Sequence, residues 1–351
     1  MAILLDEVNT ITQKTIMPGV VDNFFKSGPL MAYLRSRFTR RWNGPLIQEN
    51  YLFRPMKGGA YRPGGVFDTT KVTPYTGIQF TPRYYDVNIT EYLEELEVTL
   101  AGPMAMFSKV KADMGAAAMT LSAILEIALF HHGQNLGAGP LDRSAELNGL
   151  EEVLNDGVNP SYDGNVFPIY GGQTRVDVAP ALNPPAGKVA ANINGGINFS
   201  NLEHSFLSAQ IGSERPKIGI TTNRGMGYIA ESFAPQQKID TMDPEINWPG
   251  FKFNGATIVM SQYMPGADGV DDPNLGDYFS PTESLIWLNP GPQGEDAYLR
   301  LYIAASPKFA FGFTGFKGAR DDNELSGQIL FAGNLTARSP RLSRWLHGIS
   351  K

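Results

Sequence analysis

One stretch without an internal proline, from residue 103 to about residue 132, constrains the fold more than any other feature of the sequence. It is rich in Ala, Met and Leu, and only Gly115 weakens it. Proline is tolerated in a first helical turn, so Pro103 starts a helix of roughly 45 Å at 1.5 Å per residue. Gly133 is expected to end it as a C′ glycine. Since Glu126 interrupts the most apolar part, a buried core helix is expected rather than a membrane span.

The rest of the chain is broken by turn-forming residues. There are 38 glycines and 25 prolines in 351 residues, more than a helical bundle tolerates, while 42% hydrophobic residues suffice for a core. Strand-like segments lie at 216–222, 256–263, 284–288, 297–304 and 328–335, and shorter helices are expected at 201–211, with Ser200 as N-cap, and at 226–233. The region 135–196 is rich in turns. The pattern predicts an α+β fold.

A long hairpin is expected before the long helix. Two β-like stretches, 46–55 and 77–87, flank a segment whose tip carries four glycines, at positions 58, 59, 64 and 65. Downstream, residues 96–100 alternate with period two and read as a strand end, whereas the first half of 88–101 is also compatible with a helix. The glycines do not form a phosphate loop, because the Gly-Lys-Ser/Thr ending is missing.

Residues 1–45 are expected to form an arm with little core of its own. Short helical patterns at 22–26 and 29–38 are separated by glycine and proline. The second pattern and the residues after it carry four arginines: Arg35, Arg37, Arg40 and Arg41. Guanidinium groups bind phosphate or acidic protein surface equally well. We favour protein, since the acidic segment 86–97 of the same or a neighbouring chain offers such a surface.

Composition and motifs exclude several classes of function. A net charge of -6 provides no global basic field for sequence-specific nucleic-acid binding. The absence of cysteine removes disulfides, thiolate metal sites and cysteine nucleophiles, and fits a reducing cytoplasm. The adjacent pair His131 and His132 lacks metal-ligand spacing, the acidic run 268–274 lacks the calcium-loop pattern, and no Gly-x-Ser-x-Gly elbow occurs. No catalytic residue, metal or cofactor is therefore expected.

Several short motifs, taken in order, resemble a known family. They are Phe25-Lys26-Ser27-Gly28-Pro29-Leu30, then Asn148-Gly149-Leu150 followed by Tyr170-Gly171-Gly172-Gln173-Thr174-Arg175, then Pro-Lys-Ile-Gly-Ile-Thr-Thr at 216–222 and Phe-Lys-Phe-Asn-Gly-Ala-Thr-Ile-Val at 251–259. Together with the order of arm, hairpin and long helix, they resemble the major capsid proteins of tailed bacteriophages, which share the Hong Kong 97 type fold. The resemblance spans nearly the whole chain.

The resemblance implies a division of the chain. An N-terminal arm covers 1–45, an extended loop in the form of a β-hairpin covers 46–88, and a peripheral domain with its spine helix at about 103–132 covers 89–150. Residues 151–300 form mainly the axial domain, and the C-terminal strands of 301–351 return to the peripheral domain.

The resemblance also implies a structural function rather than an enzymatic one. Copies would assemble in the host cytoplasm into pentamers and hexamers of an icosahedral virion shell, which encloses double-stranded DNA without sequence-specific binding and needs no membrane. Scaffolding, portal and decoration proteins are open as further partners. Contacts between subunits are expected at Arg35, Arg37, Arg40, Arg41, Lys57, Tyr61 and Arg62. No covalent crosslink is expected from Lys57 or Lys71.

Two other functions remain open at the level of sequence. A cellular nanocompartment shell, as in encapsulins, shares the fold. A β-rich carbohydrate-active enzyme would explain the aromatic residues, including Trp42, Trp248, Trp287 and Trp345, although their scatter along the chain argues against one sugar platform.

Overall fold

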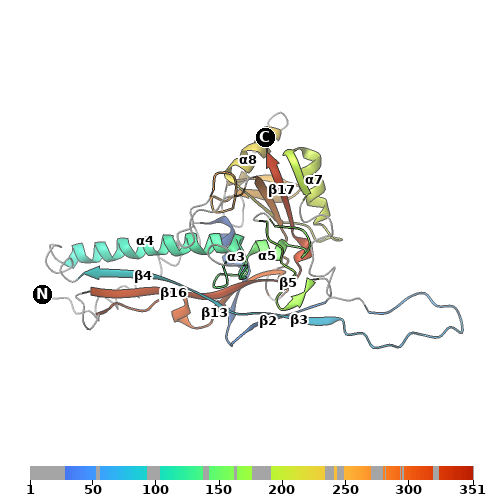
Figure 1. The fold of residues 1–351 in the computed structure, drawn as a ribbon, viewed down its shortest axis with the longest axis horizontal. Coiled ribbons are helices and arrows are strands. Elements are labelled where there is room, and N and C mark those ends of the chain that lie inside the picture. The colour runs from blue at the N-terminus through green and yellow to red at the C-terminus, as the bar shows by residue number, and fades with distance from the viewer. Residues whose placement is uncertain are drawn as a thin grey trace.

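The structure is a computed structural model that describes residues 28–52, 56–92, 103–136, 142–161, 164–175, 191–233, 241–242, 249–269, 280, 282–292, 294, 296–318 and 324–350. A long lower layer of strands lies under one long helix, a second sheet with two helices rises above one end, and a hairpin extends sideways from that end (Figure 1). The described chain is α+β, as expected.

The long helix predicted from composition is present as α4 (Pro103–Phe130). The segment Lys109–Phe130 is long and apolar enough to cross a membrane, but 67% of its most apolar window is buried inside the protein, which is the behaviour of a core helix. The expected C′ role of Gly133 is wrong, because its φ is not left-handed. That glycine instead allows close chain approach, since a Cβ there would lie 2.7 Å from the carbonyl oxygen of Glu146.

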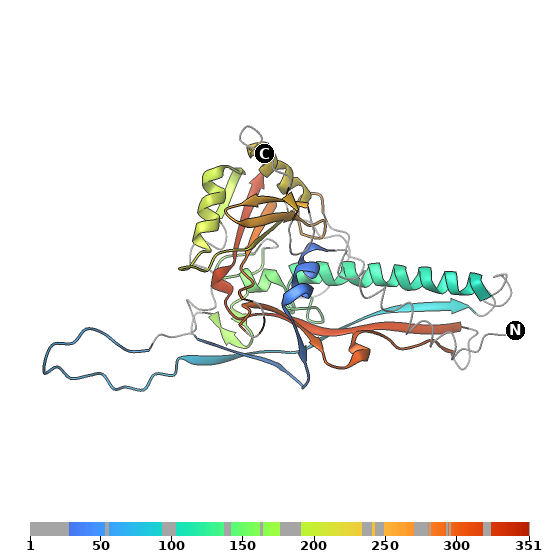
Figure 2. The ribbon, with the colours of Figure 1, turned by 180° about the vertical axis from the view of Figure 1, so that it is seen from behind.

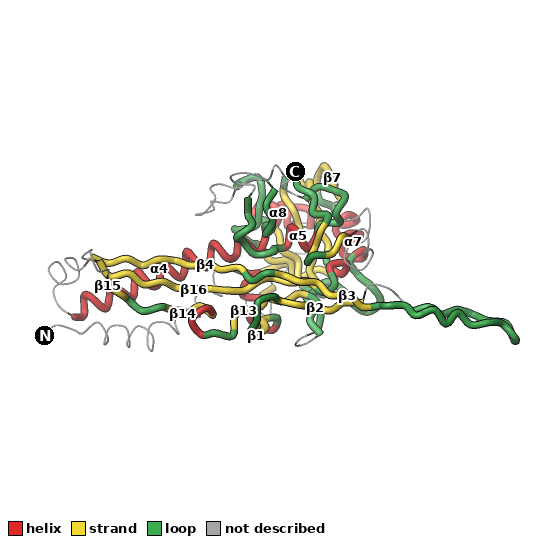
Figure 3. The backbone as a smooth tube through the Cα atoms, turned by 60° about the horizontal axis from the view of Figure 1, so that its bottom comes forward, coloured by secondary structure: helices red, strands yellow, loops and turns green. Residues whose placement is uncertain are grey.

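The lower layer is a sheet built around one long strand, β16 (Glu324–Ala337). On one side β16 pairs with β4 (Arg83–Tyr92) in antiparallel register, from Tyr92 opposite Glu324 to Arg83 opposite Gly333. On the other side it pairs with β13 (Leu299–Ala304), β14 (Ala310–Phe313) and β15 (Lys317–Gly318). The edge strand β1 (Thr39–Trp42) runs parallel to β13. Figure 3 shows α4 lying along β4 and β16.

The second sheet has the order β7-β17-β12-β8-β11-β10-β9. Its strands are β7 (Ala191–Gly196), β8 (Ile218–Thr221), β9 (Thr241–Met242), β10 (Pro249–Phe253), β11 (Ala256–Met260), β12 (Glu283–Leu288) and β17 (Arg344–Ser350). Helices α7 (Phe199–Ser208) and α8 (Asn223–Phe233) accompany it. The expected N-cap of α7 is corrected from Ser200 to Asn198, whose side chain accepts the N–H of Asn201. The sequence pattern predicted β8, β11, β12, α7 and α8 close to their observed positions, but it did not predict β7, β9, β10 or β17.

The hairpin consists of β2 (Ile47–Leu52) and β3 (Tyr75–Phe80), paired from Ile47 opposite Phe80 to Leu52 opposite Tyr75. The expected single strand 77–87 is wrong. It is split at Pro82, which has no N–H to donate to a ladder, and the chain beyond it becomes β4 on a different partner. The first half of 88–101 is strand rather than helix as far as Tyr92. Residues 96–100 lie outside the described part of the chain.

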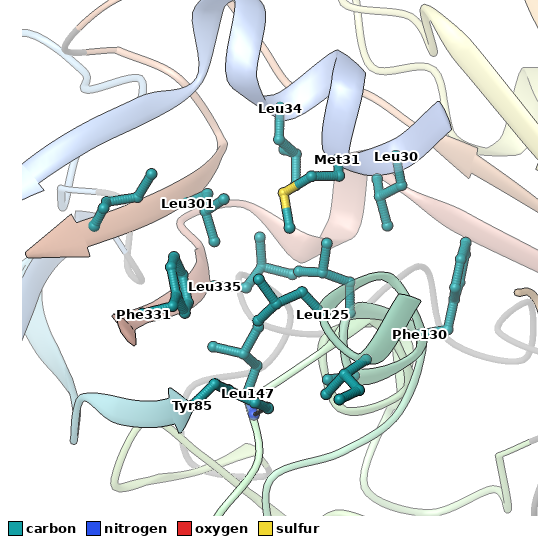
Figure 4. Packing of buried hydrophobic residues seen from close by; sticks show 14 of the residues in the cluster. Leu30, Met31, Leu34, Tyr85, Leu125, Phe130, Leu147, Leu301, Phe331 and Leu335 are labelled. Atoms are coloured by element: carbon teal, nitrogen blue, oxygen red, sulfur yellow. Dashed lines mark hydrogen bonds between the residues drawn. The ribbon is translucent and has the colours of Figure 1, made fainter. Parts of the chain in front are cut away.

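The segment from Gly28 to Trp42 is not the coreless arm that the sequence suggested. Its helix α3 (Pro29–Arg37) buries Leu30, Met31 and Leu34 completely or nearly so. These side chains face Leu125 and Leu301 in the main core (Figure 4). Tyr33 of α3 and Phe38, which follows the helix as its C-cap residue, are buried in the same core.

The turn-rich region contains short regular elements that the sequence pattern did not reveal. These are α5 (Leu150–Leu154), β5 (Ile169–Tyr170) and β6 (Gln173–Thr174). Two single 3-10 turns, η4 (Pro307–Phe309) and η5 (Pro340–Leu342), complete the described elements. Elements of two to five residues are too short to carry a readable period.

Candidate functional site

The hairpin loop lies apart from the body of the protein (Figures 1 and 2). Every residue from 56 to 71 is exposed. A Cβ added at Gly58, Gly59 or Gly64 would meet no other atom within 4 Å. Fixing the backbone of each loop residue costs roughly 1–2 kcal/mol, and the loop gains little burial in return. Within the described part of the chain, the loop therefore gains little stabilisation from its own body.

The end of the loop is a defined turn. The carbonyl oxygen of Arg62 accepts the N–H of Gly65 at 2.9 Å, and Gly64 has φ +82. Proline in the second position and a left-handed glycine in the third are the signature of a type II turn. The turn therefore requires Gly64, whereas Tyr61 and Arg62 before it are exposed residues that the turn does not constrain in type.

Apolar side chains gather on this loop. The rings of Tyr61 and Phe67 lie 4.9 Å apart between centroids and are 67% and 64% exposed. Val66 is 98% exposed and Met56 68%. We call these four residues the tip patch. Exposed apolar residues that cluster in this way mark an interaction surface.

Lys57 and Asp68 connect the two sides of the loop. Lys57 Nζ lies 2.6 Å from Asp68 Oδ2, and Asp68 also accepts the backbone N–H and the hydroxyl of Thr70. The hydrogen bond from Lys57, followed by those from Thr70, lowers the pKa of Asp68 to about 2. Lys57 is thus held as one half of an exposed ion pair, which sets the width of the loop and contributes little to stability.

The base of the hairpin, in contrast, is clamped to the body. The buried carboxylate of Glu49 on β2 accepts Arg300 Nη1 at 2.6 Å and also the hydroxyl of Tyr302, both from β13. Burial, followed by the hydrogen bond to Glu49, raises the pKa of Tyr302. Since Glu49 and Arg300 are 251 residues apart, no spacing rule applied to the sequence finds this pair.

The arginines divide between a helix and an edge strand. Arg35 lies on α3, half-buried, while Arg40 and Arg41 lie on β1 and are exposed. Together with Thr39, Ile303, Ala310 and Phe311, these three line a pocket of about 300 Å³, the arginine pocket. Arg37 ends α3, and its side chain lies outside the described part of the structure.

The arginines do not meet the described acidic residues of their own chain's segment 86–97. The strands β13 and β16 separate β1 from β4, a distance of about 14 Å at the usual strand spacing. Glu91 pairs instead with Lys109, whose Nζ lies 2.5 Å from its carboxylate. Residues 93–97 lie outside the described part of the chain. The prediction that the arginines pair with the acidic segment of the same chain is therefore wrong for Asp86 and Glu91.

The remaining sequence motifs have structural roles. His131 is fully buried near Glu151, and His132 packs its ring against Phe167. Among the described residues, no group of three His, Asp or Glu side chains is placed to hold a metal ion. Trp287 and Trp345 are buried, so they offer no sugar platform, and Trp248 lies outside the described residues.

Glu126 is an important buried residue whose role the sequence did not reveal. From within α4 its carboxylate accepts the N–H groups of Leu30 at 3.0 Å and Met31 at 2.8 Å, and so caps the first turn of α3. Gly28 is required beside it, because a Cβ there would lie 2.3 Å from the carboxyl carbon. Burial raises the pKa of Glu126 to about 7, against the opposing effect of the two hydrogen bonds.

This pKa predicts a specific pH dependence. Between the ordinary value of 4.5 and about 7, the folded chain holds a proton at Glu126 that the unfolded chain releases. The contribution of Glu126 to the free energy of unfolding is therefore fully present below pH 4.5 and decreases as the pH rises to about 7. The Glu126→Gln variant should lack this component, so the difference in melting temperature between parent and variant should shrink or reverse as pH rises from about 5 to about 8. A constant difference across this range would contradict the assignment.

The chain is similar to known proteins in structure, but no sequence comparison finds a match. No protein-family model matches the chain, and neither does any curated protein sequence. The cyanophage A-1(L) capsid is similar with a TM-score of 0.63 and 13% identity, covering 92% of this chain and 93% of that one. The capsid of an empty GTA particle has a TM-score of 0.55 and 10% identity, covering 91% and 90%. The SrpI encapsulin of Synechococcus elongatus PCC 7942 has a TM-score of 0.53 and 8% identity, covering 90% and 86%.

These likenesses span almost the full length of both chains and show the fold. The chain has an α+β fold of the kind found in phage capsid proteins, and an encapsulin also has it. The sequence resemblance to capsid proteins is confirmed at this level.

Proposed function

We propose that the chain is a major capsid protein, whose copies assemble into pentamers and hexamers of an icosahedral shell around the double-stranded DNA of a tailed phage. The observation that carries the proposal is the hairpin: its base is clamped by a buried ion pair, while its loop exposes every residue from 56 to 71. A rigid base with a loop that is exposed within the described part of its own chain suits a contact between subunits. The likeness in fold to a cyanophage capsid supports the proposal.

Within this proposal, the parts of the chain have distinct roles. The hairpin serves as the extended loop, α4 as the spine helix of a peripheral domain, and the seven-stranded sheet with α7 and α8 as most of an axial domain. The acidic chain encloses the genome without gripping it, because its net charge is -6. Scaffolding, portal and decoration proteins are the further partners to search for.

An encapsulin-like compartment is the second candidate, and the likeness to the SrpI encapsulin favours it. Both candidates are shells, so electron microscopy of the purified chain tests what they share: closed particles or rings are expected. A monomer under all assembly conditions would overturn both. Nuclease-protected double-stranded DNA in particles from infected cells supports the capsid, whereas particles that retain a specific protein cargo and no DNA support the compartment.

Shells of this chain are expected to contain no covalent link between subunits. The ammonium of Lys57 is already paired with Asp68, and a protonated amine is a poor nucleophile. Boiled in denaturant and separated on a gel, shells should run as single chains of 38.3 kDa. A ladder of multimers would contradict this expectation, and its loss in a Lys57→Arg variant would identify the reacting amine.

A further inference from the structure

The first turn of α3 depends on a side chain from another helix. Its N-cap residue, Gly28, has no side chain to offer, and Pro29 in the first helical position has no N–H. The next two N–H groups, those of Leu30 and Met31, both donate to the carboxyl oxygens of Glu126. One buried side chain of α4 therefore provides the side-chain cap of α3.

Glu126 is an acid in surroundings that disfavour its charge. Its side chain is 0% exposed. Burial raises its pKa to about 7, the bonds to Met31 and Leu30 act in the opposite direction, and no charged side chain is among the causes. A carboxyl group in such a place favours its neutral form. Within the described part of the chain, loss of its proton leaves a buried charge that two N–H groups alone compensate.

Charged side chains on the elements around α3 and α4 have contacts of their own. These are Arg83 of β4 with the carbonyl of Gly133, Glu91 of β4 with Lys109, Glu152 of α5 with Asn148, and Arg300 of β13 with Glu49. His131, which follows α4, lies 3.9 Å from Glu151 of α5. On α3 itself, Arg35 lies in the last turn, at the opposite end from the cap. Burial, rather than a charged neighbour, therefore governs the proton on Glu126.

α3 is too short to persist without its contacts. It has nine residues, whereas isolated helices of fewer than about 12 residues are marginal in water. Leu30 and Leu34 are 0% exposed, and Figure 4 shows them beside Leu125 and Leu301. A local opening of α3 would bring the carboxylate of Glu126 into water without unfolding either sheet.

We propose that the proton on Glu126 controls the docking of α3: with the proton in place the helix stays on the body, and after its loss α3 opens locally while both sheets remain folded. The proton is favoured in the docked state and lost more readily in the open one, so opening increases as the pH rises. This inference concerns the single chain and does not depend on the proposed shell.

Hydrogen exchange of the unassembled chain, followed by mass spectrometry of its peptides, tests the proposal. After correction for the intrinsic effect of pH on exchange, the protection of peptides from α3 should fall by roughly 70-fold between pH 5 and pH 8, given the change in pKa from 4.5 to about 7. Peptides from β8 and β16 report global unfolding. At pH 8 those from α3 should exchange faster than either strand.

Two variants assign the effect to one carboxyl group. Glu126→Gln has no proton to lose, so the protection of its α3 should no longer change with pH. The matched control Glu203→Gln makes the same change on α7, beside the other sheet, and should keep the pH profile of the parent.

Each outcome decides for or against the proposal. Equal protection of α3 and of both strands at every pH would mean that α3 opens only when the whole chain unfolds, and would overturn it. A pH dependence that persists in Glu126→Gln would assign the proton to another group, such as His131, with the same consequence. If that variant does not fold, the parent decides: a fall between pH 4.5 and about 7 supports Glu126, whereas a fall confined to pH above about 6.5 indicates a histidine and contradicts it.

Discussion

A variant in which both Tyr61 and Arg62 are replaced by alanine is expected to fold as the parent does and to lose most of its ability to form shells. Neither side chain supports the body, because the loop around them is exposed from residue 56 to 71. Tyrosine and arginine at the centre of an interface are frequent hot spots, each with a cost of about 2 kcal/mol or more on truncation. A loss of that size weakens each contact by about 30-fold, and a shell repeats the contact in every subunit.

Assembly yield by size-exclusion chromatography and electron microscopy measures this effect, and circular dichroism and thermal melting of the unassembled chain provide the control. The matched variant Thr69→Ala changes the same exposed loop outside the tip patch and should retain most of the yield. If the double variant forms shells normally, the hairpin does not act as an intersubunit loop. If it unfolds, the tip belongs to a core of its own subunit.

Replacing Glu49 by alanine should produce the largest loss of stability among single substitutions at the hairpin. It leaves the buried guanidinium of Arg300 without its carboxylate, and removal of one partner of a buried ion pair costs about 3–5 kcal/mol. The hydroxyl of Tyr302 loses its acceptor as well. Denaturant unfolding of the unassembled chain measures the change, and shell yield should fall with it because the hairpin loses its anchor.

A second variant separates the charge from the packing. In the Glu49→Leu and Arg300→Met double variant no charge remains buried, so much of the stability should return, as it does when apolar residues replace buried ion pairs elsewhere. Asp68→Ala, which breaks the exposed pair with Lys57, should barely alter unfolding. A loss below about 1 kcal/mol for Glu49→Ala would show that the pair does not hold the hairpin.

Local patterns predicted a part of the regular elements of this protein. The stretch without an internal proline, rich in Ala, Met and Leu, became α4, the β-branched runs became β8, β11, β12, β13 and β16, and the glycines at the hairpin tip became a type II turn. Such features follow from the sequence alone because helical and strand periods, and the φ angles that glycine and proline permit, depend on residues only a few positions apart.

The tertiary structure decided which of these elements meet. The strand after Pro82 pairs with β16 rather than with the hairpin, α3 joins the main core, and Glu126 caps α3 from 95 residues away. The clamp between Glu49 and Arg300 and the pocket of Arg35, Arg40 and Arg41 likewise join elements that are distant in the chain. The physical reason is that a buried charge or a strand edge takes whichever complementary partner the packing brings within about 3 Å, and no local period encodes that partner.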